Sequence, residues 1–511
     1  MGVAWFGTLP VAAQYKTPIL GKVSCSNGYA AGFPCKNMDL LSFLPMKSVG
    51  IPVDAEGNPT GTLSGSWGWT DPDSGREFAI SGNSIGTSFI EVTNPQQPVY
   101  LGILPIPSTA KPNAWREMKS YQHYALIVGD AAGNHGMQIF DLNNLLQVKN
   151  PPVTFQEAAH YSGVASTHEI AVNEATGVAY LVGVNGSTNS CGGGLHMVDV
   201  KNPLDPKFMG CFTETRVGRR GTGYVHDTQC VVYHGPDTRY TGKEICFDFA
   251  ETAVNIADVT DKTAASSLSI TNYPSLGYTH QGWLSEDHRY LYVDDELDEF
   301  SGLTSIYMRT LIFDVSNLVR PVLVNEYKVY SEAIDHNQYV RGNYLYQSNY
   351  TAGVMVYSLQ DPVNPDFVAS FDCVAEKNGI EFDGAWNAHP FYKSGIVVLN
   401  CMEQGLFVVK AQEHVIANET EELPHSLQTK PVFPNPFHDT ATLRFGLSKA
   451  QHLKIQVFDL HGRLLQVPLD GFQPAGAGQV ELKATHWPAG LYLYQILGED
   501  GAVSGKFIVG Y

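Results

Sequence analysis

Short apolar segments recur along most of this chain at nearly even intervals, and each ends in a polar turn. The clearest copies are MQIFDLNN, LHMVDVKNP, VNIADVTD, TLIFDVSNL and VMVYSLQDP, and SFIEVTNP and LFVVKAQ are fainter ones. Aligned on their polar ends, the seven copies are 50, 58, 59, 56, 44 and 52 residues apart, at Glu91, Asp141, Asp199, Asp258, Asp314, Ser358 and Lys410. Such a period is typical of one structural unit repeated with loops of variable length.

The unit is built from strands. Its apolar residues alternate or run in bursts of Val, Ile, Tyr and Phe, as in RYLYVDD, NYLYQSN and GIVVLNC, and Gly, Asn, Asp and Pro bound each burst. Each repeat has an inner strand, a YLYV-type strand, an IFDV-type strand and an outer strand that begins at Pro, such as PVYLGIL. Four strands per repeat describe a β-propeller blade, so we predict an all-β, seven-bladed β-propeller over residues 14–412.

The last repeat stops near Gln412 without its outer strand, and MDLLSFLPM, residues 38–46, precedes the first full repeat. We expect this N-terminal segment to supply the missing strand and to complete the seventh blade. Closing the ring in this way removes the exposed sheet edges that invite aggregation.

Composition and charge exclude two classes of partner. The chain has 511 residues, 43% of them hydrophobic, without an apolar run near 18 residues, so we expect no transmembrane segment. With 32 basic and 51 acidic residues, its net charge is −19. Nucleic acids and anionic membranes require a positive face, so the partners that remain are a protein, a glycan or a cation.

Eight cysteines fall into four neighbouring couples without CxxC spacing: Cys25 with Cys35, Cys191 with Cys211, Cys230 with Cys246, and Cys373 with Cys401. We predict four disulfides and therefore an oxidising compartment, with buried free thiols as the alternative. The apolar run VAWFGTLPVAAQ lacks a basic start, and we interpret residues 1–13 as a truncated signal peptide.

The chain changes character after a polar linker, residues 413–430. PNPF, VFDLHGR and PAGLYLYQI follow within residues 431–511, a region that resembles the type A sorting domain of the type IX secretion system. The resemblance implies a Bacteroidetes-type Gram-negative bacterium, contact with the type IX machinery, and a secreted or cell-surface protein. The alternating strands of this region predict a small antiparallel β-sandwich.

The repeats themselves resemble a known family. CGGGLHMVDVKNPLDPKFMGCF, GYTHQGW, YVDDELDE and AIDHN are similar to the choice-of-anchor B family, which is built from LVIVD-type propeller repeats, and the resemblance runs from about Val23 to Val409. It implies an exported propeller with a variable C-terminal anchor. It supplies no molecular activity, because a fold does not define a function.

A histidine followed by a polar residue recurs at His168, His226, His280 and His336, with gaps of 58, 54 and 56 residues, and His389 follows 53 residues later. We expect these histidines at one rim of the channel, each bonded to the backbone of an adjacent blade, with the following polar residue orienting the ring. The alternative is a transition-metal site made by two or three of them, with Glu169 and Asp227 beside them.

The segment YVDDELDEF places five carboxylates within six residues: Asp294, Asp295, Glu296, Asp298 and Glu299. Carboxylates this close repel one another unless a cation neutralises them, and calcium is the cation we expect there, although the spacing is not that of an EF-hand. A solvated acidic loop is the alternative.

Catalytic motifs are weak. GNSIG satisfies the G-x-S-x-G pattern, but it lies between two predicted strands, so Ser84 is interpreted as a turn residue. CGGGLH opens a strand, and we expect no nucleotide cofactor. Five tryptophans lie near predicted inner strands, where they pack as core or stack on a sugar: Trp67, Trp69, Trp115, Trp283 and Trp386. We therefore predict an exported binding or scaffold module rather than an enzyme, and keep a metal-dependent oxidase or hydrolase with a histidine-lined channel as the alternative.

Overall fold

The computed structural model describes residues 16–186, 191–304, 307–413, 415, 428–429, 432, 435, 437–447, 450–460, 462–473, 476–498 and 501–510. The predicted signal segment, residues 1–13, lies outside them, as does most of the predicted linker. The chain divides into two compact units, residues 1–417 and 418–511, so the boundary falls inside that linker.

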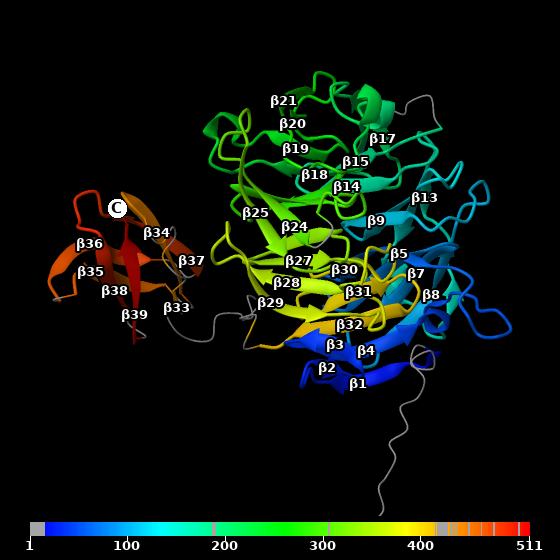
Figure 1. Cartoon of the computed structure of the whole chain (residues 1–511), viewed down its shortest axis with the longest axis horizontal. Coiled ribbons are helices and arrows are strands. Elements are labelled where there is room, and N and C mark those ends of the chain that lie inside the picture. Colours follow the sequence, from blue (N-terminus) through cyan, green and yellow to red (C-terminus); the bar gives the residue numbers. More distant parts are fainter. Residues whose placement is uncertain are drawn as a thin grey trace, which may run out of the picture. The chain divides into compact units, whose positions relative to one another are not determined.

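In its described residues, the first unit consists of seven sheets that share one plan, an antiparallel series of four strands (Figure 1). The innermost strands are β5 (Leu63–Thr70), β9 (Arg116–Tyr121), β14 (Glu169–Asn173), β18 (Asp227–Val232), β22 (Thr279–Leu284), β26 (Gln338–Arg341) and β30 (Ala385–His389). The second strands are β6 (Glu77–Asn83), β10 (Tyr124–Gly129), β15 (Val178–Val182), β19 (Glu244–Phe249), β23 (Tyr290–Asp295), β27 (Tyr344–Ser348) and β31 (Val397–Cys401).

The third strands carry the sequence repeat. They are β7 (Gly86–Glu91), β11 (Met137–Asp141), β16 (Leu195–Asp199), β20 (Val254–Asp258), β24 (Met308–Asp314), β28 (Val354–Ser358) and β32 (Gly405–Ala411). Six of the seven polar residues aligned in the sequence are the last residue of their strand, and Lys410 is the last but one. The periodicity therefore reports a true structural repeat.

The fourth strands are β8 (Val99–Pro105), β13 (Ala159–Tyr161), β17 (Lys207–Phe212), β21 (Ser266–Thr271), β25 (Val322–Val329), β29 (Asp366–Phe371) and β4 (Met38–Pro45). β4 is the N-terminal segment expected to complete the last repeat, and it pairs antiparallel with β32, Phe43 opposite Phe407. The pairing prediction is confirmed. Four short strands extend the outer edges: β1 (Ile19–Val23), β2 (Tyr29–Ala30), β3 (Phe33–Lys36) and β12 (Val153–Thr154).

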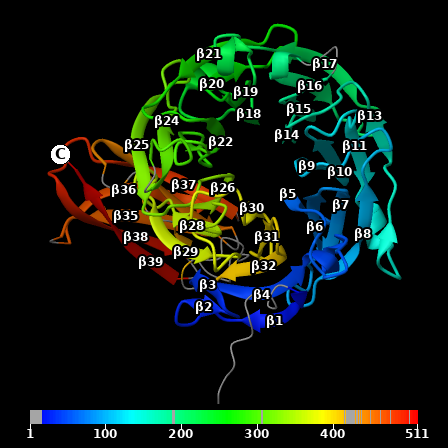
Figure 2. The same ribbon diagram turned by 45° about the vertical axis from the view of Figure 1, so that its right-hand side comes forward.

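Figure 2 shows the sheets following one another in chain order, with the innermost strands toward a common centre. Strand ladders stay within each sheet, so the sheets are separate and do not form one closed barrel. Helices in the described residues are single turns: η2 (Met46–Val49), α1 (Asn143–Leu146), η3 (Cys191–Gly193), η4 (Arg219–Gly221) and η5 (Thr238–Tyr240). The prediction of an all-β protein is confirmed.

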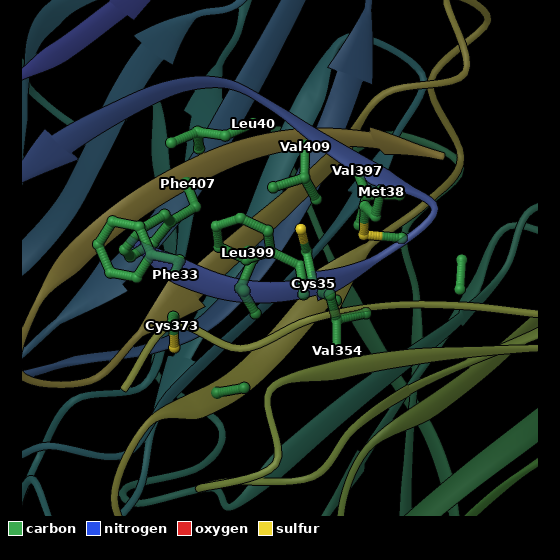
Figure 3. Packing of buried hydrophobic residues seen from close by; sticks show 14 of the residues in the cluster. Phe33, Cys35, Met38, Leu40, Val354, Cys373, Val397, Leu399, Phe407 and Val409 are labelled. Carbon is green, nitrogen blue, oxygen red and sulfur yellow. The ribbon is translucent and has the colours of Figure 1, made fainter. Parts of the chain in front are cut away.

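Neighbouring sheets are held together by apolar cores between their faces. One such core joins the sheet of β28 and β29 to that of β31, β32 and β4, and its labelled side chains meet in Figure 3. Phe407 stacks on Phe43, with ring centroids 4.4 Å apart, and lies edge-on to Phe33 at 5.1 Å. Aromatic pairs in these geometries add about 0.5–1.5 kcal/mol beyond the burial of their surface.

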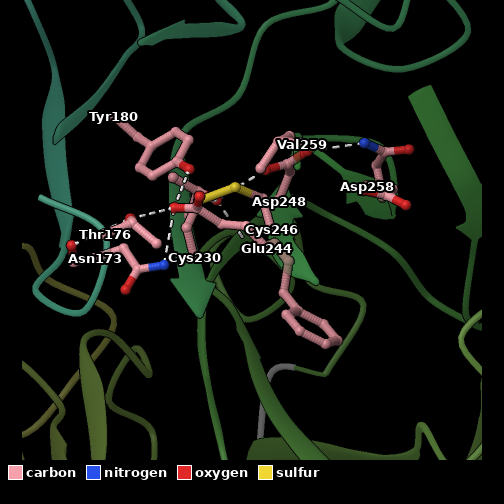
Figure 4. Close-up of a disulfide and its surroundings, with 12 residues drawn as sticks. Asn173, Thr176, Tyr180, Cys230, Glu244, Cys246, Asp248, Asp258 and Val259 are labelled. Carbon is pink, nitrogen blue, oxygen red and sulfur yellow. Dashed lines mark hydrogen bonds between the residues drawn. A yellow bond between two sulfur atoms is a disulfide. The ribbon is translucent and has the colours of Figure 1, made fainter. Parts of the chain in front are cut away.

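All four predicted disulfides are present. Cys230 and Cys246 face each other on β18 and β19, and Cys373 and Cys401 join two neighbouring sheets. Figure 4 shows the first of these bonds beside Glu244, whose carboxylate accepts hydrogen bonds from Tyr180 and other side chains of the preceding sheet. Polar anchors between sheets thus supplement the apolar cores.

The second unit is a small domain of two antiparallel sheets. One contains β33 (Gln428–Thr429), β34 (Thr440–Leu447) and β37 (Gly476–Lys483), and the other β36 (Leu464–Gln473), β35 (Gln451–Phe458), β38 (Gly490–Gly498) and β39 (Gly501–Val509). Their inward residues, among them Leu443, Ile455 and Phe507, form one buried apolar cluster. The alternating pattern in the sequence thus produces two sheets with one common core.

Candidate metal centre

Four histidines from four consecutive sheets lie in one row. His168 and His226 immediately precede β14 and β18, His280 is the second residue of β22, and His336 lies two residues before β26. Neighbouring ring centroids in the row are 4.2, 4.2 and 4.6 Å apart. The repeat therefore brings all four rings to the same end of the inner strands.

The Nδ1 atom of each ring lies within hydrogen-bond distance of an acceptor. The acceptors are Asp130 Oδ2 for His168 (3.0 Å), the carbonyl of His280 for His226 (3.0 Å), Asp294 Oδ1 for His280 (3.0 Å) and the carbonyl of Trp386 for His336 (2.8 Å). A carbonyl can only accept, so Nδ1 of His226 and His336 carries the proton. In the neutral rings, Nε2 then has a free lone pair.

The acceptors of His226 and His336 are backbone carbonyls of a neighbouring sheet, as the tethering interpretation expects. That of His168 is a side chain of a neighbouring sheet, and that of His280 is a side chain of its own sheet. The expectation that the residue after each histidine orients its ring is wrong. Glu169, for example, pairs with Lys119 at 3.0 Å and does not hold His168. Consecutive residues of a strand point to opposite faces, which places the following residue away from the ring.

Glu296 brings a carboxylate between two of the rings. Its Oε2 lies 3.9 Å from His280 Nε2, and its Oε1 lies 3.7 Å from His336 Nε2. Both distances are too long for hydrogen bonds. Ligand atoms about 2.0–2.2 Å from a tetrahedral ion are roughly 3.3–3.6 Å apart, so small movements of these side chains bring both pairs of atoms to the spacing of two ligands of one metal ion. We call His168, His226, His280, His336 and Glu296 the histidine cluster.

Burial keeps most of these rings neutral. It lowers the pKa of His226 and of His280 well below the ordinary value, with neighbouring histidines acting in the same direction, and it lowers the pKa of His336 to about 3. Burial also opposes the charged form of His168, but Asp130, with Glu169 and Glu296 acting in the same direction, outweighs it and the pKa of His168 is raised. A neutral imidazole is the form that binds a metal.

The acidic run does not form one site. Asp294 accepts from the His280 ring, and Asp295 accepts from the backbone N–H groups of Gly277 and Tyr278. Glu296 belongs to the histidine cluster. Asp298 and Glu299 lie in a separate buried group whose third member is Asp335, a residue that the sequence analysis missed. We call Asp298, Glu299 and Asp335 the carboxylate cluster.

Other candidates fall outside both clusters. His389 is the last residue of β30, so it does not share the register of the other histidines. Ser84 lies in the two-residue turn between β6 and β7, as predicted. Cys191 and Cys211 lie close to His196, but their sulfur atoms are joined in a disulfide and are not free to bind a metal.

A cavity of about 320 Å³ is lined by Trp67, Lys119, Asp227, Gln281 and Trp283, among others, and by none of the histidine cluster. Trp67 and Trp283 both contact Phe391, with ring centroids 5.7 and 6.0 Å apart. These tryptophans therefore pack on other aromatic rings and also border a cavity. A sugar ligand at this place stays a prediction.

Comparison with known proteins identifies the second unit. Residues 431–510 match the family described as a secretion system C-terminal sorting domain. Among curated proteins there is no match.

Solved structures resemble the chain only distantly. A protein from Lactobacillus plantarum is 14% identical with a TM-score of 0.41, covering 83% of this chain and 99% of its own. A fungal alcohol oxidase of the AA5 family in complex with copper is 9% identical with a TM-score of 0.43, and the match covers 90% of this chain and 98% of the oxidase chain. PorZ, a surface component of the type IX secretion system of Porphyromonas gingivalis, is 12% identical with a TM-score of 0.32, and the match covers 85% of this chain and 64% of the PorZ chain. We draw no function from similarities at this level.

In the part of the chain that the structure describes, no helix is long and apolar enough to cross a membrane. The sorting domain directs a protein to the type IX secretion machinery. The chain is a secreted or cell-surface protein of a Gram-negative bacterium that carries a C-terminal secretion sorting domain.

Proposed function

We propose that the first unit is an exported module that binds one divalent transition-metal ion through His280, His336 and Glu296. The observation that carries this proposal is the arrangement of donor atoms, because one ring nitrogen of each histidine and one oxygen of Glu296 lie within 4.8 Å of one another, and Nε2 of each ring faces that carboxylate at 3.9 and 3.7 Å. Imidazole nitrogens with a carboxylate suit Zn²⁺, Cu²⁺ or Ni²⁺ better than Ca²⁺.

Hydrogen bonding around these ligands also favours a metal. Metal-binding histidines nearly always donate their other N–H to a carboxylate or a carbonyl, which fixes the ring and its tautomer. Asp294 and the carbonyl of Trp386 occupy those positions here, and the hydroxyl of Tyr350 donates to Glu296 Oε1 at 2.7 Å. The tethering and metal interpretations are therefore compatible, since tethering uses Nδ1 and the metal uses Nε2.

Calorimetric titration of the chelator-treated full chain with Zn²⁺ tests the proposal. We expect one ion per chain, and at least a 1000-fold loss of affinity in the double variant His280→Ala/His336→Ala. The matched control is His234→Ala, because His234 is an exposed histidine of the same unit. Unchanged affinity in the double variant, or equal loss in the control, contradicts the proposal.

We also propose that the seven sheets are the blades of a closed propeller of the choice-of-anchor B type from a Bacteroidetes-type bacterium. In support, successive inner strands contact one another from β5 to β26, β27 contacts β30, and β30 contacts β5 again. The pairing of β4 with β32 joins the two ends of the unit. Deleting residues 1–50 should then abolish the cooperative melting transition of this unit, and an unchanged transition contradicts closure.

The binding module is preferred to the metal-dependent oxidase or hydrolase. A substrate of such an enzyme must lie beside the metal, whereas the cavity described above is lined by none of the proposed ligands. The metal then serves to bind or to present a partner at the cell surface, where the sorting domain delivers the protein.

A further inference from the structure

The carboxylate cluster is unusual in how deeply it is buried. Asp298 and Glu299 lie in the turn after β23, and Asp335 lies shortly before β26 on the next sheet. Their exposed fractions are 0%, 1% and 1%. One oxygen from each lies within 4.8 Å of the other two, so three acidic groups share one small volume away from solvent.

Several of these oxygens have no partner. Among the described residues, no other group donates to either carboxylate oxygen of Glu299 or to Oδ1 of Asp298, so these two carboxyls share a proton with each other or bind a cation. The buried hydroxyl of Thr304 also has no partner, although its backbone N–H donates to the carbonyl of Asp298. Buried polar atoms are almost always satisfied in folded proteins, so each exception requires an explanation such as a bound ion.

One positive charge balances the cluster only in part. Arg309, itself 1% exposed at its side chain, donates to Asp298 Oδ2 at 2.5 Å. Asp335 is fixed by the backbone, accepting from the N–H groups of Asp295 and Arg309 at 3.1 Å each. When all three carboxylates are ionised, one guanidinium leaves two negative charges, which a divalent cation neutralises; protons are the competing way to neutralise them.

We propose that Asp298, Glu299 and Asp335 bind a calcium ion that holds the turn between β23 and β24. Calcium prefers oxygen ligands at about 2.3–2.6 Å, so two ligands of one ion are at most about 5.2 Å apart, and the three oxygens, all within 4.8 Å of one another, meet this limit. A site made only of oxygens discriminates against the softer metals that the histidine cluster suits.

The calcium ion has a second consequence, which rests on the proposed function of the histidine cluster. Glu296 lies two residues before Asp298 on the same turn, and the N–H of Asp298 donates to the carbonyl of Asp295. Fixing Asp298 and Glu299 therefore fixes Glu296 against His280 and His336. We infer that calcium raises the affinity for the transition metal, and by linkage that the transition metal raises the affinity for calcium to the same degree.

Titration of the chelator-treated full chain with Ca²⁺ alone tests the site. We expect one Ca²⁺ per chain in the wild type and in His280→Ala/His336→Ala, because this variant leaves the carboxylate cluster intact. Glu299→Gln should bind Ca²⁺ at least 100-fold more weakly. Glu332→Gln, which changes an exposed carboxylate close to Asp335 in the sequence, should bind as the wild type does.

Other results overturn the proposal. A wild type that fails to bind Ca²⁺ at millimolar concentration, or a Glu299→Gln variant that binds as tightly as the wild type, shows that protons rather than calcium neutralise the cluster. If Glu299→Gln fails to fold, the melting temperature of the wild type decides, because it must rise with Ca²⁺ and fall with chelator. If Ca²⁺ binds but Zn²⁺ does not, the calcium site stands and the function proposed for the histidine cluster fails.

Discussion

The histidine cluster and the carboxylate cluster are joined by a single turn, yet they differ in how their buried polar atoms are paired. In the first, each ring is tethered through Nδ1, and burial keeps His226, His280 and His336 neutral. In the second, burial and the neighbouring carboxylates raise the pKa of Glu299, and its oxygens lack partners. A cluster of neutral, tethered groups is stable when empty, whereas a cluster of buried carboxylates requires a counter-ion to fold well.

This contrast gives the two proposed cation sites different roles. The histidine cluster is preorganised, so an ion there adds affinity for a partner without being needed for the fold. The carboxylate cluster couples its ion to folding, because the unfolded chain does not hold the three oxygens together.

The largest effect is expected at Arg309, the only counter-charge that the described residues bring within 4.0 Å of the carboxylate cluster. Arg309→Met leaves three buried carboxylates without it and removes hydrogen bonds to the carbonyls of Pro274 and Ser275. We expect a loss of about 3–5 kcal/mol in the free energy of unfolding.

Urea denaturation in the presence of chelator measures this loss. The control is Arg289→Met, because Arg289 is 39% exposed at its side chain and lies 3.4 Å from Asp314, an arrangement worth about 0–1 kcal/mol. If Arg309→Met and Arg289→Met lose the same free energy of unfolding, the carboxylate cluster does not depend on its counter-charge.

Asp248 is a buried carboxylate outside both clusters, and it serves as the comparison in which no ion is expected. Its two oxygens accept from Thr228 and Asn255 at 2.8 Å, so no oxygen is left over, and burial raises its pKa to about 7. Between pH 4 and 7 the folded chain keeps a proton that the unfolded chain has released. The contribution of Asp248 to stability therefore falls as the pH rises through this window, by about 1.4 kcal/mol per pH unit and about 4 kcal/mol in all, and is level above it.

Asp248→Asn should remove this slope, and urea denaturation of the variant and the wild type from pH 4 to 8 measures it. Chelator should leave the difference in free energy of unfolding between the variant and the wild type unchanged. For variants of the carboxylate cluster, chelator should change that difference. A variant with the same pH slope as the wild type contradicts the assignment.

The third prediction separates the members of the histidine row. His336→Ala removes a ligand next to Glu296, so we expect about a 100-fold loss in Zn²⁺ affinity, about 3 kcal/mol. His168 lies at the far end of the row, and His168→Ala should lose less than tenfold. Titration with Ca²⁺ should give the same affinity for both variants and the wild type. Equal losses of Zn²⁺ affinity in the two variants would show that the ion does not lie between His280 and His336.

The sequence predicted the repeat well because every repeat buries the same pattern. The polar ends of the apolar runs coincide with the ends of the third strands, and residues 38–46 form the strand that pairs with β32. The disulfide couples were also predictable, since the two cysteines of each couple are at most 28 residues apart in the sequence. Both depend on contacts that are local or repeated.

The site was predicted only in part, because its remaining contacts are neither local nor repeated. The spacing of the four histidines predicted that they meet. It did not predict the roles of Asp130 or Asp335, since their hydrogen bonds join residues of neighbouring sheets that are far apart in the sequence. Nor could adjacency in the acidic run show that Glu296 and Asp298 belong to different clusters, because the direction of each side chain in a turn depends on the fold around it.

The smallest effect is expected at Tyr350, which contacts a proposed ligand and not the ion. Its hydroxyl donates to Glu296 Oε1 at 2.7 Å, and its ring lies 4.4 Å from that of His336. Tyr350→Phe keeps the ring and removes only the hydroxyl, so the carboxylate loses the donor that orients it. Losses of about 10–100-fold are typical when such a partner of a metal ligand is removed, and we expect the lower end, about tenfold in Zn²⁺ affinity, because both histidines remain tethered.

Calorimetric titration measures the change, with Tyr330→Phe as the control, since Tyr330 is 88% exposed. Calcium affinity should stay the same in both variants. A Tyr350→Phe variant that loses calcium rather than zinc would place Glu296 in the carboxylate cluster and would erase the contrast between the two sites.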